Sequence, residues 1–401
     1  MKTFVIIGGG AAGYFAAINA AERQPNLKII ILEAGSHVLQ KVKISGGGRC
    51  NVTNACIEPK ELVNFYPRGQ KELLGPFHQF STNDTIQWFE NHGVALKIEA
   101  DNRVFPKSDC AQTIIDCFLG QAKKYGVELL INHRVNEINK QGNLFKITTT
   151  KQTLTANYVL IATGSSPNMF SIIKSLGHQV IKPIPSLFTF NIKDERLKDL
   201  LGISVPFANI KILNTKLAAQ GPILITHWGL SGPAILKLSS WGAIELFKKN
   251  YQFDIEINWL YKKPETVLAL LNKAKATNLK KHVALHAPFE TLPKRLWERF
   301  IAAADINPNT IWAEISLKQL QNIVKQLTES RFKVSGKSTF KEEFVTAGGL
   351  DLKELNFKRF ESKLHPNLFF AGEVLNIDAL TGGFNFQNAW TGGFVVANAI
   401  N

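Results

Sequence analysis

The pattern of apolar positions near the N-terminus predicts a strand, a helix and a second strand. Residues 4–7 read Phe-Val-Ile-Ile, and residues 28–32 read Lys-Ile-Ile-Ile-Leu. Apolar runs without polar alternation are typical of parallel strands that are buried on both faces of a sheet. A helix is predicted over residues 11–23, between the two runs. The chain therefore opens with a βαβ unit.

Further strands are predicted before residue 190. Residues 127–131 are predicted to form one strand, and residues 158–161 form an apolar run that returns to the sheet. Two short runs, 145–150 and 153–155, flank Lys151-Gln152, and this arrangement indicates a small hairpin.

The pattern changes near residue 185, where short β-rich runs begin and continue to residue 258. Turn residues separate these runs, which favours a compact β-barrel or sandwich. From 264 to 328 the spacing is helical, and helices are predicted to start at Pro264 and to cover 293–304 and 316–327. After Phe340 a strand at 368–371 and a C-terminal helix at 386–400 complete the pattern. The β-rich runs are 188–192, 210–213, 223–226 and 253–257.

A glycine turn joins the first strand to the first helix. Gly8, Gly10 and Gly13 fit GxGxxG in the context that a dinucleotide-binding motif requires. The first glycine permits the tight turn, the second lets the backbone approach a pyrophosphate, and the third lets the helix pack on the strand. Glu33 ends the next strand, where a carboxylate can bind ribose hydroxyls and would repel a 2′-phosphate. The turn therefore predicts FAD or NAD.

A second glycine run lies at residues 45–54, Ser-Gly-Gly-Gly-Arg-Cys-Asn-Val-Thr-Asn. Three consecutive glycines cost backbone entropy, so a plain linker rarely needs them beside Arg49 and Asn51. We interpret Gly46–Gly48 as an anion nest over the pyrophosphate or the flavin, with Arg49 supplying positive charge.

The C-terminal segment carries a second set of features that can bind a dinucleotide. Gly372-Glu373 follows a strand, Asp378 comes next, and Gly383 precedes the last helix. Glu373 is predicted to bind the ribityl chain, and the helix start to face the flavin ring, where negative charge develops on reduction. Paired terminal features of this kind hold FAD from both ends, so FAD is the predicted cofactor. The predicted FAD-binding residues are Gly8, Gly10, Ala11, Ala12, Gly13, Glu33, Lys41, Ser45, Gly46, Gly47, Gly48, Arg49, Asn51, Val135, Ala162, Thr163, Gly164, Gly372, Glu373, Asp378, Gly383, Asn385 and Phe386.

Several longer stretches then identify a family. They are GGGAAG from Gly8, KVKISGGGRCNVTN from Lys41, RVFPKS from Arg103, THWGLSGPAIL from Thr226, VTAGGL from Val345, FESK from Phe360 and AGEVLNIDALTGGFNFQNAWTGG from Ala371. Over its whole length the chain resembles the BaiN-like or aminoacetone-oxidase-like NAD(P)/FAD-dependent oxidoreductases. It departs from the family pattern at Asn376 and Ala379. The resemblance therefore does not determine which residues tune the edge of the active site.

The resemblance implies an α/β fold: a discontinuous, Rossmann-like FAD-binding domain with an inserted β-barrel that carries a small helical domain. This agrees with the changes of pattern along the chain. We expect the FAD-binding domain at 1–190 and 341–401, the barrel at 191–260, the helical subdomain at 261–328, and a return through the barrel at 329–340.

Composition limits the class of protein, its cellular compartment and its partners. No stretch approaches the roughly 18 apolar residues of a membrane span, and the N-terminus lacks a signal-peptide layout. The four cysteines show no CxxC pair and no zinc-like spacing, so no metal is predicted and a reducing cytoplasm fits. The net charge of +15 comes from scattered lysines, which favours a solvated surface or attraction of an anionic cofactor or substrate over nucleic acid as partner.

We therefore predict a cytoplasmic FAD-dependent oxidoreductase that moves a hydride between a small organic substrate and the flavin N5. No second GxGxxG follows a later strand, so NAD(P)H and oxygen both remain as candidate second partners. The catalytic acid or base is unassigned. For His227 we favour a role in domain packing, and for Cys50 a structural role. Ser231, in the same turn as His227, is a candidate for binding a substrate carboxylate or phosphate. The alternatives are a flavin-containing RNA-binding or RNA-modifying protein and a purely structural FAD; the oligomeric state is open.

Overall fold

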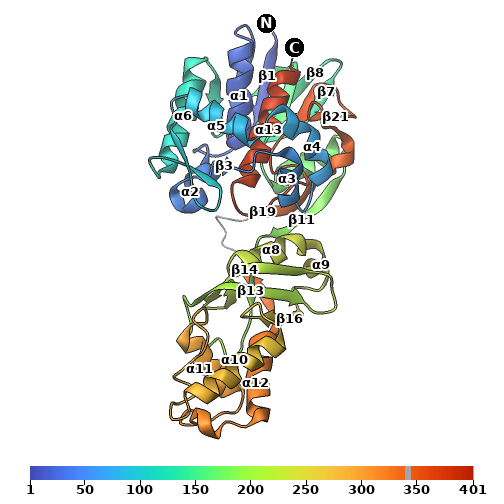
Figure 1. Cartoon of the computed structure of the whole chain (residues 1–401). Coiled ribbons are helices and arrows are strands. Elements are labelled where there is room, and N and C mark those ends of the chain that lie inside the picture. The colour runs from blue at the N-terminus through green and yellow to red at the C-terminus, as the bar shows by residue number, and fades with distance from the viewer. Residues whose placement is uncertain (339–344, 401) are drawn as a thin grey trace. The chain divides into compact units, whose positions relative to one another are not determined.

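A computed structural model describes residues 1–338 and 345–400 and divides the chain into two compact units (Figure 1). The first unit joins Met1–Pro185 to Lys341–Asn401, and the second is Ser186–Phe340. The first unit is therefore discontinuous in sequence, and each unit has its own apolar core.

The first unit is built on a sheet that is mainly parallel. β1 lies in its middle, pairing in parallel with β10 on one side and β2 on the other. The predicted βαβ unit is confirmed, and its strands lack alternation because both faces of the sheet are covered. The order is β20 (Leu355–Asn356), β21 (Glu361–Ser362), β22 (Leu368–Phe370), β10 (Tyr158–Ile161), β1 (Thr3–Ile7), β2 (Lys28–Leu32) and β6 (Glu128–Leu130).

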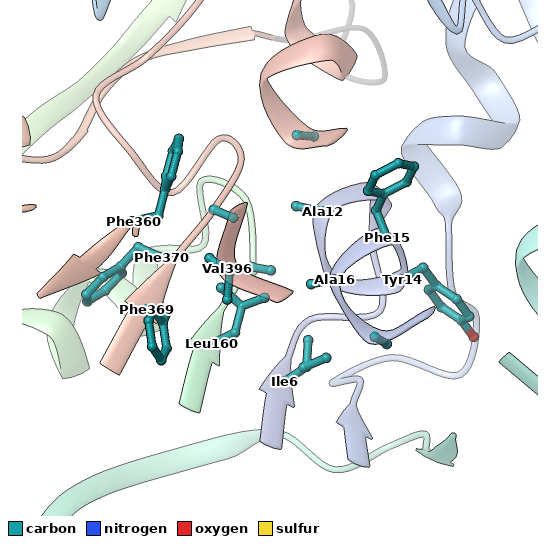
Figure 2. Packing of buried hydrophobic residues seen from close by; sticks show 14 of the residues in the cluster. Ile6, Ala12, Tyr14, Phe15, Ala16, Leu160, Phe360, Phe369, Phe370 and Val396 are labelled. Atoms are coloured by element: carbon teal, nitrogen blue, oxygen red, sulfur yellow. The ribbon is translucent and has the colours of Figure 1, made fainter. Parts of the chain in front are cut away.

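Two helices from opposite ends of the sequence pack side by side against this sheet. α1 (Ala11–Arg23) and α13 (Phe384–Ala399) approach so closely that a Cβ on Gly393 would lie 2.8 Å from the Ala12 carbonyl oxygen. Figure 2 shows Ala12, Phe15 and Ala16 of α1 in one apolar cluster with Val396 of α13. The C-terminal helix is thereby fixed beside the N-terminal glycine turn.

The remaining elements of the first unit surround these two layers. The predicted hairpin is confirmed as part of a three-stranded antiparallel sheet, β7-β8-β9. The elements are α2 (Gln40–Gly48), β3 (Thr53–Asn54), α3 (Pro59–Leu62), η1 (Val63–Phe65), α4 (Gln70–Gln79), α5 (Thr82–Asn91), β4 (Leu96–Ile98), β5 (Arg103–Pro106), α6 (Ala111–Lys124), β7 (Val135–Gln141), β8 (Leu144–Thr149), β9 (Thr153–Ala156), α7 (Pro167–Ser175), β11 (Val180–Ser186), β19 (Val345–Leu350) and η3 (Leu352–Glu354).

The second unit contains an antiparallel sheet, seven-stranded over the described residues, that closes on itself. Its edge strands, β17 and β18, are separated in sequence by Ser335 alone, whose N–H donates to the Asn191 carbonyl at 2.9 Å. One residue spans about 3.5 Å, so the two edges must lie next to each other. This strand order favours the barrel over the sandwich. The order is β17 (Ser330–Val334), β16 (Phe253–Asn258), β13 (Ser204–Ile212), β14 (Ala218–Thr226), β15 (Gly229–Ser231), β12 (Thr189–Asn191) and β18 (Gly336–Ser338).

Helices complete the second unit. The predicted helix start at Pro264 is confirmed, and Ser316 caps α12 by accepting the Gln319 N–H at 3.2 Å. The helices are α8 (Pro233–Trp241), α9 (Ala243–Lys248), α10 (Pro264–Thr277), α11 (Lys294–Ala303), η2 (Trp312–Glu314) and α12 (Leu317–Thr328). Among the described helices of both units, none has the length and apolar character that crossing a membrane demands.

Candidate cofactor site

The first glycine turn leaves no room for a side chain at Gly8 or Gly13. Gly8 has φ +114°, and a Cβ there would lie 2.5 Å from the Ala162 carbonyl oxygen. A Cβ on Gly13 would lie 2.1 Å from the Gly8 oxygen, and Gly10 is the N-cap of α1. The turn is therefore pressed between α1 and the end of β10, and Ala11 and Ala12 follow it as the first residues of the helix.

Glu33 is held rigidly at the end of β2. Its Oε2 accepts the Gly9 N–H at 2.9 Å and its Oε1 accepts the Gly35 N–H at 2.8 Å. Each oxygen retains acceptor capacity for a ligand hydroxyl. Burial, followed by the negative charge of Glu33, raises the pKa of Tyr14 to about 12, so that phenol stays neutral.

The second glycine run interrupts α2. Ser45 has ψ 150°, and Gly46, Gly47 and Gly48 follow with φ +58°, +68° and +84°. A Cβ on Gly47 or Gly48 would meet nothing within 4 Å, and both residues are exposed. Consecutive positive-φ residues turn their amides toward one side, as an anion nest requires.

Arg49, which follows this run, already has partners inside the protein. Its guanidinium lies 3.9 Å from the centre of the Phe105 ring and donates to Glu99 at 2.7 Å, with Asp109 at 3.4 Å. The hydrogen bond to Glu99 raises the pKa of Arg49. Its predicted contact with a pyrophosphate stays a prediction, and two carboxylates already share its charge.

A polar cluster forms around Glu373. Its Oε1 accepts the Thr346 N–H at 3.1 Å, and its Oε2 forms an ion pair with Lys41. A Cβ on Gly164 would lie 3.7 Å from the same Oε2, and Gly372 has φ +78°. The cluster therefore unites predicted residues from three distant segments of the sequence.

Two hydroxyl groups next to this cluster have no hydrogen-bond partner in the part of the chain that the structure describes. Thr163 Oγ1 and Thr346 Oγ1 are both buried and make no hydrogen bond to any described residue. Leaving a buried polar group unsatisfied costs about 1–3 kcal/mol. A bound ligand with polar atoms would remove that cost, so these hydroxyls mark a binding site. The sequence reasoning missed Thr346, although it lies within the VTAGGL stretch.

The start of α13 is fixed by residues 51–54. Gly383, its N-cap, has φ +91°, and a Cβ there would lie 2.4 Å from the Thr53 oxygen. With its amide oxygen turned toward the helix, Asn51 accepts the Gly383 N–H at 2.9 Å, and Asn54 donates to the Gly382 oxygen at 3.1 Å. The positive end of the helix dipole is thereby held in place.

A buried network supports the same helix start. Gln387 Oε1 accepts from Thr53 at 2.6 Å and from Thr85 at 2.9 Å, while its Nε2 donates to Thr391 at 3.0 Å. Thr391 donates in turn to the Phe80 oxygen. Because these side chains are fully enclosed, the network fixes the rotation of α13 about its axis.

Other predicted residues have partners inside the protein. Asp378 is fully buried and forms a two-oxygen ion pair with Arg68, and Asn385 binds both backbone groups of Ala379. Their direct contacts with a cofactor stay predictions. Arg68, which lies in none of the quoted motifs, was missed. Two further predicted residues are Phe386, which stacks on Trp390, and Val135, which is buried at the start of β7.

The two candidate reactive groups from the sequence have different surroundings. Cys50 is buried, and burial raises its pKa to about 12, so it stays a thiol and not the nucleophilic thiolate. His227 lies in the second unit, in the turn between β14 and β15.

The chemistry of the site fits FAD. Close glycine turns suit a pyrophosphate, a fixed carboxylate suits a ribose, and unpartnered hydroxyls with a glycine-capped helix start suit the polar parts of a flavin. All of these features lie in the first unit.

Comparisons with known proteins agree with this fit. The family described as "HI0933-like protein Rossmann domain" matches residues 2–399. The chain is similar to a ribosomal RNA dihydrouridine synthase of Escherichia coli, with 30% identity covering 98% of this chain and 96% of the relative. It is also similar, at 25% identity, to a 3-dehydro-bile acid delta(4,6)-reductase of Clostridium scindens, with 100% and 99% covered.

Among solved structures, the fold is similar to that of a 3-ketosteroid-delta4-(5alpha)-dehydrogenase from Rhodococcus jostii. The TM-score is 0.51 at 13% identity, with 99% of this chain and 97% of that chain covered. These structural likenesses concern the fold alone.

Proposed function

Because the chain belongs to the HI0933-like family of FAD-dependent oxidoreductases, we propose that it reduces a carbon–carbon double bond conjugated to a carbonyl group. The names of its relatives support this reaction class. Making dihydrouridine saturates the ring double bond of uridine, which is conjugated to a carbonyl. A delta(4,6)-reductase acting on a 3-dehydro substrate saturates the same kind of system.

We propose that the first unit holds the FAD that the family uses. The glycine turn and the start of α1 take the pyrophosphate, and Glu33 takes the ribose hydroxyls. Thr163 supplies a hydroxyl and Glu373 an acceptor, while the start of α13 presents positive charge to the flavin ring. When bound, FAD supplies the hydride donor and acceptor.

Lys41 is the candidate proton-handling residue of this site. It is exposed, and it pairs with Glu373 next to the unpartnered hydroxyls of Thr163 and Thr346. An ammonium held by a carboxylate can orient a substrate carbonyl and hold a proton near it.

The proposed substrate is uridine in ribosomal RNA. Full-length similarity to the E. coli enzyme carries this choice, and the charge distribution supports it. Residues 186–340 contain 22 lysines and arginines against 12 acidic residues, so this segment holds +10 (22 minus 12) of the net charge of +15. This proposal differs from the sequence analysis, in which the scattered lysines favoured a solvated surface or a small anionic ligand over nucleic acid as the partner. We also propose a cytoplasmic location, which a ribosomal RNA substrate and four cysteines without disulfides support.

A small-molecule enone is the second candidate substrate, favoured by the bile acid reductase relative. For either substrate we propose NAD(P)H as the reductant. It would bind at a site that lacks a second GxGxxG motif.

The test is an anaerobic incubation of the FAD-loaded protein with NADH or NADPH. One arm contains a uridine-rich ribosomal RNA transcript, and the other contains a steroid 4-en-3-one. We expect mass spectrometry to find a gain of two hydrogens in uridine. Reduction of the steroid alone would favour the second candidate. A flavin that NAD(P)H reduces and only oxygen reoxidises would contradict both and indicate an oxidase.

A further inference from the structure

Two large aromatic side chains lie exposed and in contact on the second unit. Phe207 is 46% exposed and Tyr261 is 50% exposed, and their ring centroids are 5.0 Å apart at an interplanar angle of 80°. Single exposed apolar residues are ordinary, but a pair that leaves half of each ring in water needs an explanation.

Phe207 owes its exposure to a β-bulge. β13 pairs with β14 through Val205↔Ile223 and then through Ala208↔Gly221, so two residues on β13 oppose one on β14. The inward–outward alternation breaks there, and both Pro206 and Phe207 face solvent. Bulges of this kind re-aim a side chain and are common beside functional sites.

Tyr261 owes its exposure to a left-handed backbone. Its φ is +52°, a conformation that a bulky residue rarely adopts. The side chain of Asn258 imposes it by accepting from the Lys262 N–H at 3.4 Å and donating to the Lys262 oxygen at 2.8 Å. Gln220 then donates to Tyr261 Oη at 3.1 Å, which fixes the ring. A strained conformation that the surroundings enforce is typical of a binding position.

Two lysines directly follow Tyr261 in the sequence. Lys262 and Lys263 are both exposed, and neither forms an ion pair with any residue that the structure describes. The nearby carboxylate of Glu256 is neutralised by Lys211 and Arg331, which leaves Glu265 in the first turn of α10 as the exposed acid beside them.

Exposed rings beside unpaired cations suit a single-stranded nucleic acid. Every base has a π-face that can stack on an aromatic ring, and lysines bind the backbone phosphates. We propose that Phe207 and Tyr261 form a stacking platform for unpaired RNA bases, with Lys262 and Lys263 on the adjoining phosphates. The choice of RNA rests on the proposed function and on the +10 charge of residues 186–340. We call these four residues the aromatic–lysine platform.

The test measures binding of a fluorescein-labelled, uridine-containing single-stranded RNA to the FAD-loaded full chain by fluorescence anisotropy. We expect Phe207→Ala and Tyr261→Ala each to weaken binding about tenfold, within the range for one stacked base. Tyr261→Phe keeps the ring and should retain the affinity. Changing Lys262 and Lys263 to Gln should lower the slope of log affinity against log salt by about 1.4, because each phosphate contact on a single strand contributes about 0.7.

Two control variants match these changes. Trp241→Ala removes another exposed ring of the second unit. Changing Lys123 and Lys124 to Gln neutralises an exposed lysine pair at the end of α6 in the first unit. Both controls should bind RNA as the unaltered protein does.

The outcomes separate this inference from the proposed function. Loss of binding in the ring variants, without uridine reduction by the unaltered protein, upholds the platform and rejects the function. Uridine reduction with unchanged RNA affinity in all platform variants rejects the platform, whose rings then serve another partner such as a protein. An unaltered protein that shows no salt-dependent RNA binding also rejects the platform.

Discussion

At the scale of single residues, the candidate cofactor site contains two kinds of glycine. Gly8 and Gly383 combine a positive φ with a backbone oxygen where a Cβ would stand. Gly47 and Gly48 have the same kind of φ but open space around them. Packing and conformation together require glycine at the first pair, and conformation alone requires it at the second pair. The space beside Gly47 and Gly48 is therefore free for the proposed anion.

Replacing Gly8 tests the packing requirement. Gly8→Ala forces a Cβ against the Ala162 oxygen, and we expect the free energy of unfolding to fall by about 2 kcal/mol or more, with loss of bound FAD. Flavin absorbance per protein and urea unfolding measure these effects. Gly120→Ala, in the open middle of α6, is the control and should be neutral or stabilising. A Gly8→Ala protein with full FAD content would contradict the account of the turn.

The unpartnered hydroxyl of Thr163 gives a second prediction. Thr163→Val should weaken FAD binding about fivefold, the effect of losing ~1 kcal/mol, without destabilising the FAD-free protein. Thr82 provides the contrast because its hydroxyl already donates to the Cys56 oxygen at 2.8 Å. Thr82→Val should lower the stability of the FAD-free protein by about 1 kcal/mol. Titration with FAD and thermal unfolding distinguish the two, and equal behaviour would count against a ligand at Thr163.

At the scale of elements, buried polar groups tie the edge of the parallel sheet to its neighbours. His178 Nδ1 lies 2.5 Å from Glu354 Oε2, and its Nε2 lies 3.0 Å from Ser362 Oγ. Ser362 also accepts the N–H groups of Leu364 and His365, so its lone pairs are occupied and the cluster is structural. It links η3 and β21 to the segment before β11.

This cluster predicts a pH dependence. Burial lowers the pKa of His178 below 6.5, and the opposing attraction of Glu354 does not cancel it. The unfolded chain therefore binds a proton before the folded one does. The stability that the neutral imidazole contributes is present above pH 6.5 and is lost as the pH falls below it, by at most about 1.4 kcal/mol per unit.

Urea unfolding at a series of pH values measures this loss. His178→Gln should be less stable at neutral pH and should flatten the dependence below pH 6.5. His78→Gln, at an exposed position of α4, should leave it unchanged. An identical profile for His178→Gln would show that other groups cause the dependence.

At the scale of the whole molecule, the chain contains two separate cores. One includes residues of the first unit from both ends of the sequence, and the other lies entirely within Ser186–Phe340. The second core contains three fully buried tryptophans, Trp259, Trp297 and Trp312, which is enough apolar surface for independent stability.

We therefore expect residues 186–340 to fold alone. Produced without the rest of the chain, they should unfold cooperatively in urea and bind no FAD. In the full protein, added FAD should raise the unfolding midpoint of the first unit more than that of the second. Amide hydrogen exchange resolves the two units. A segment 186–340 that is unfolded by itself would show that the units depend on each other.

Local sequence patterns predicted much of this fold. The βαβ unit, the hairpin, Pro264 as a helix start and the terminal helix follow from periodicity and turn chemistry, which act over a few residues. The helix predicted to begin at 386 begins at Phe384, because contacts with Thr53 and Asn51, more than 300 residues away in sequence, fix its start. Such long-range contacts leave no local signal.

The sequence by itself determined the cofactor and the class of fold, because glycine turns and apolar runs impose their geometry locally. Only the tertiary structure decided which side chains are already engaged and which are not. In it, Arg49 pairs with Glu99 and Asp378 pairs with Arg68, whereas the hydroxyls of Thr163 and Thr346 have no hydrogen-bond partner among the described residues. Hydrogen bonds and ion pairs depend on distance in space, and residues that meet at a site come from segments whose separation in sequence carries no such information.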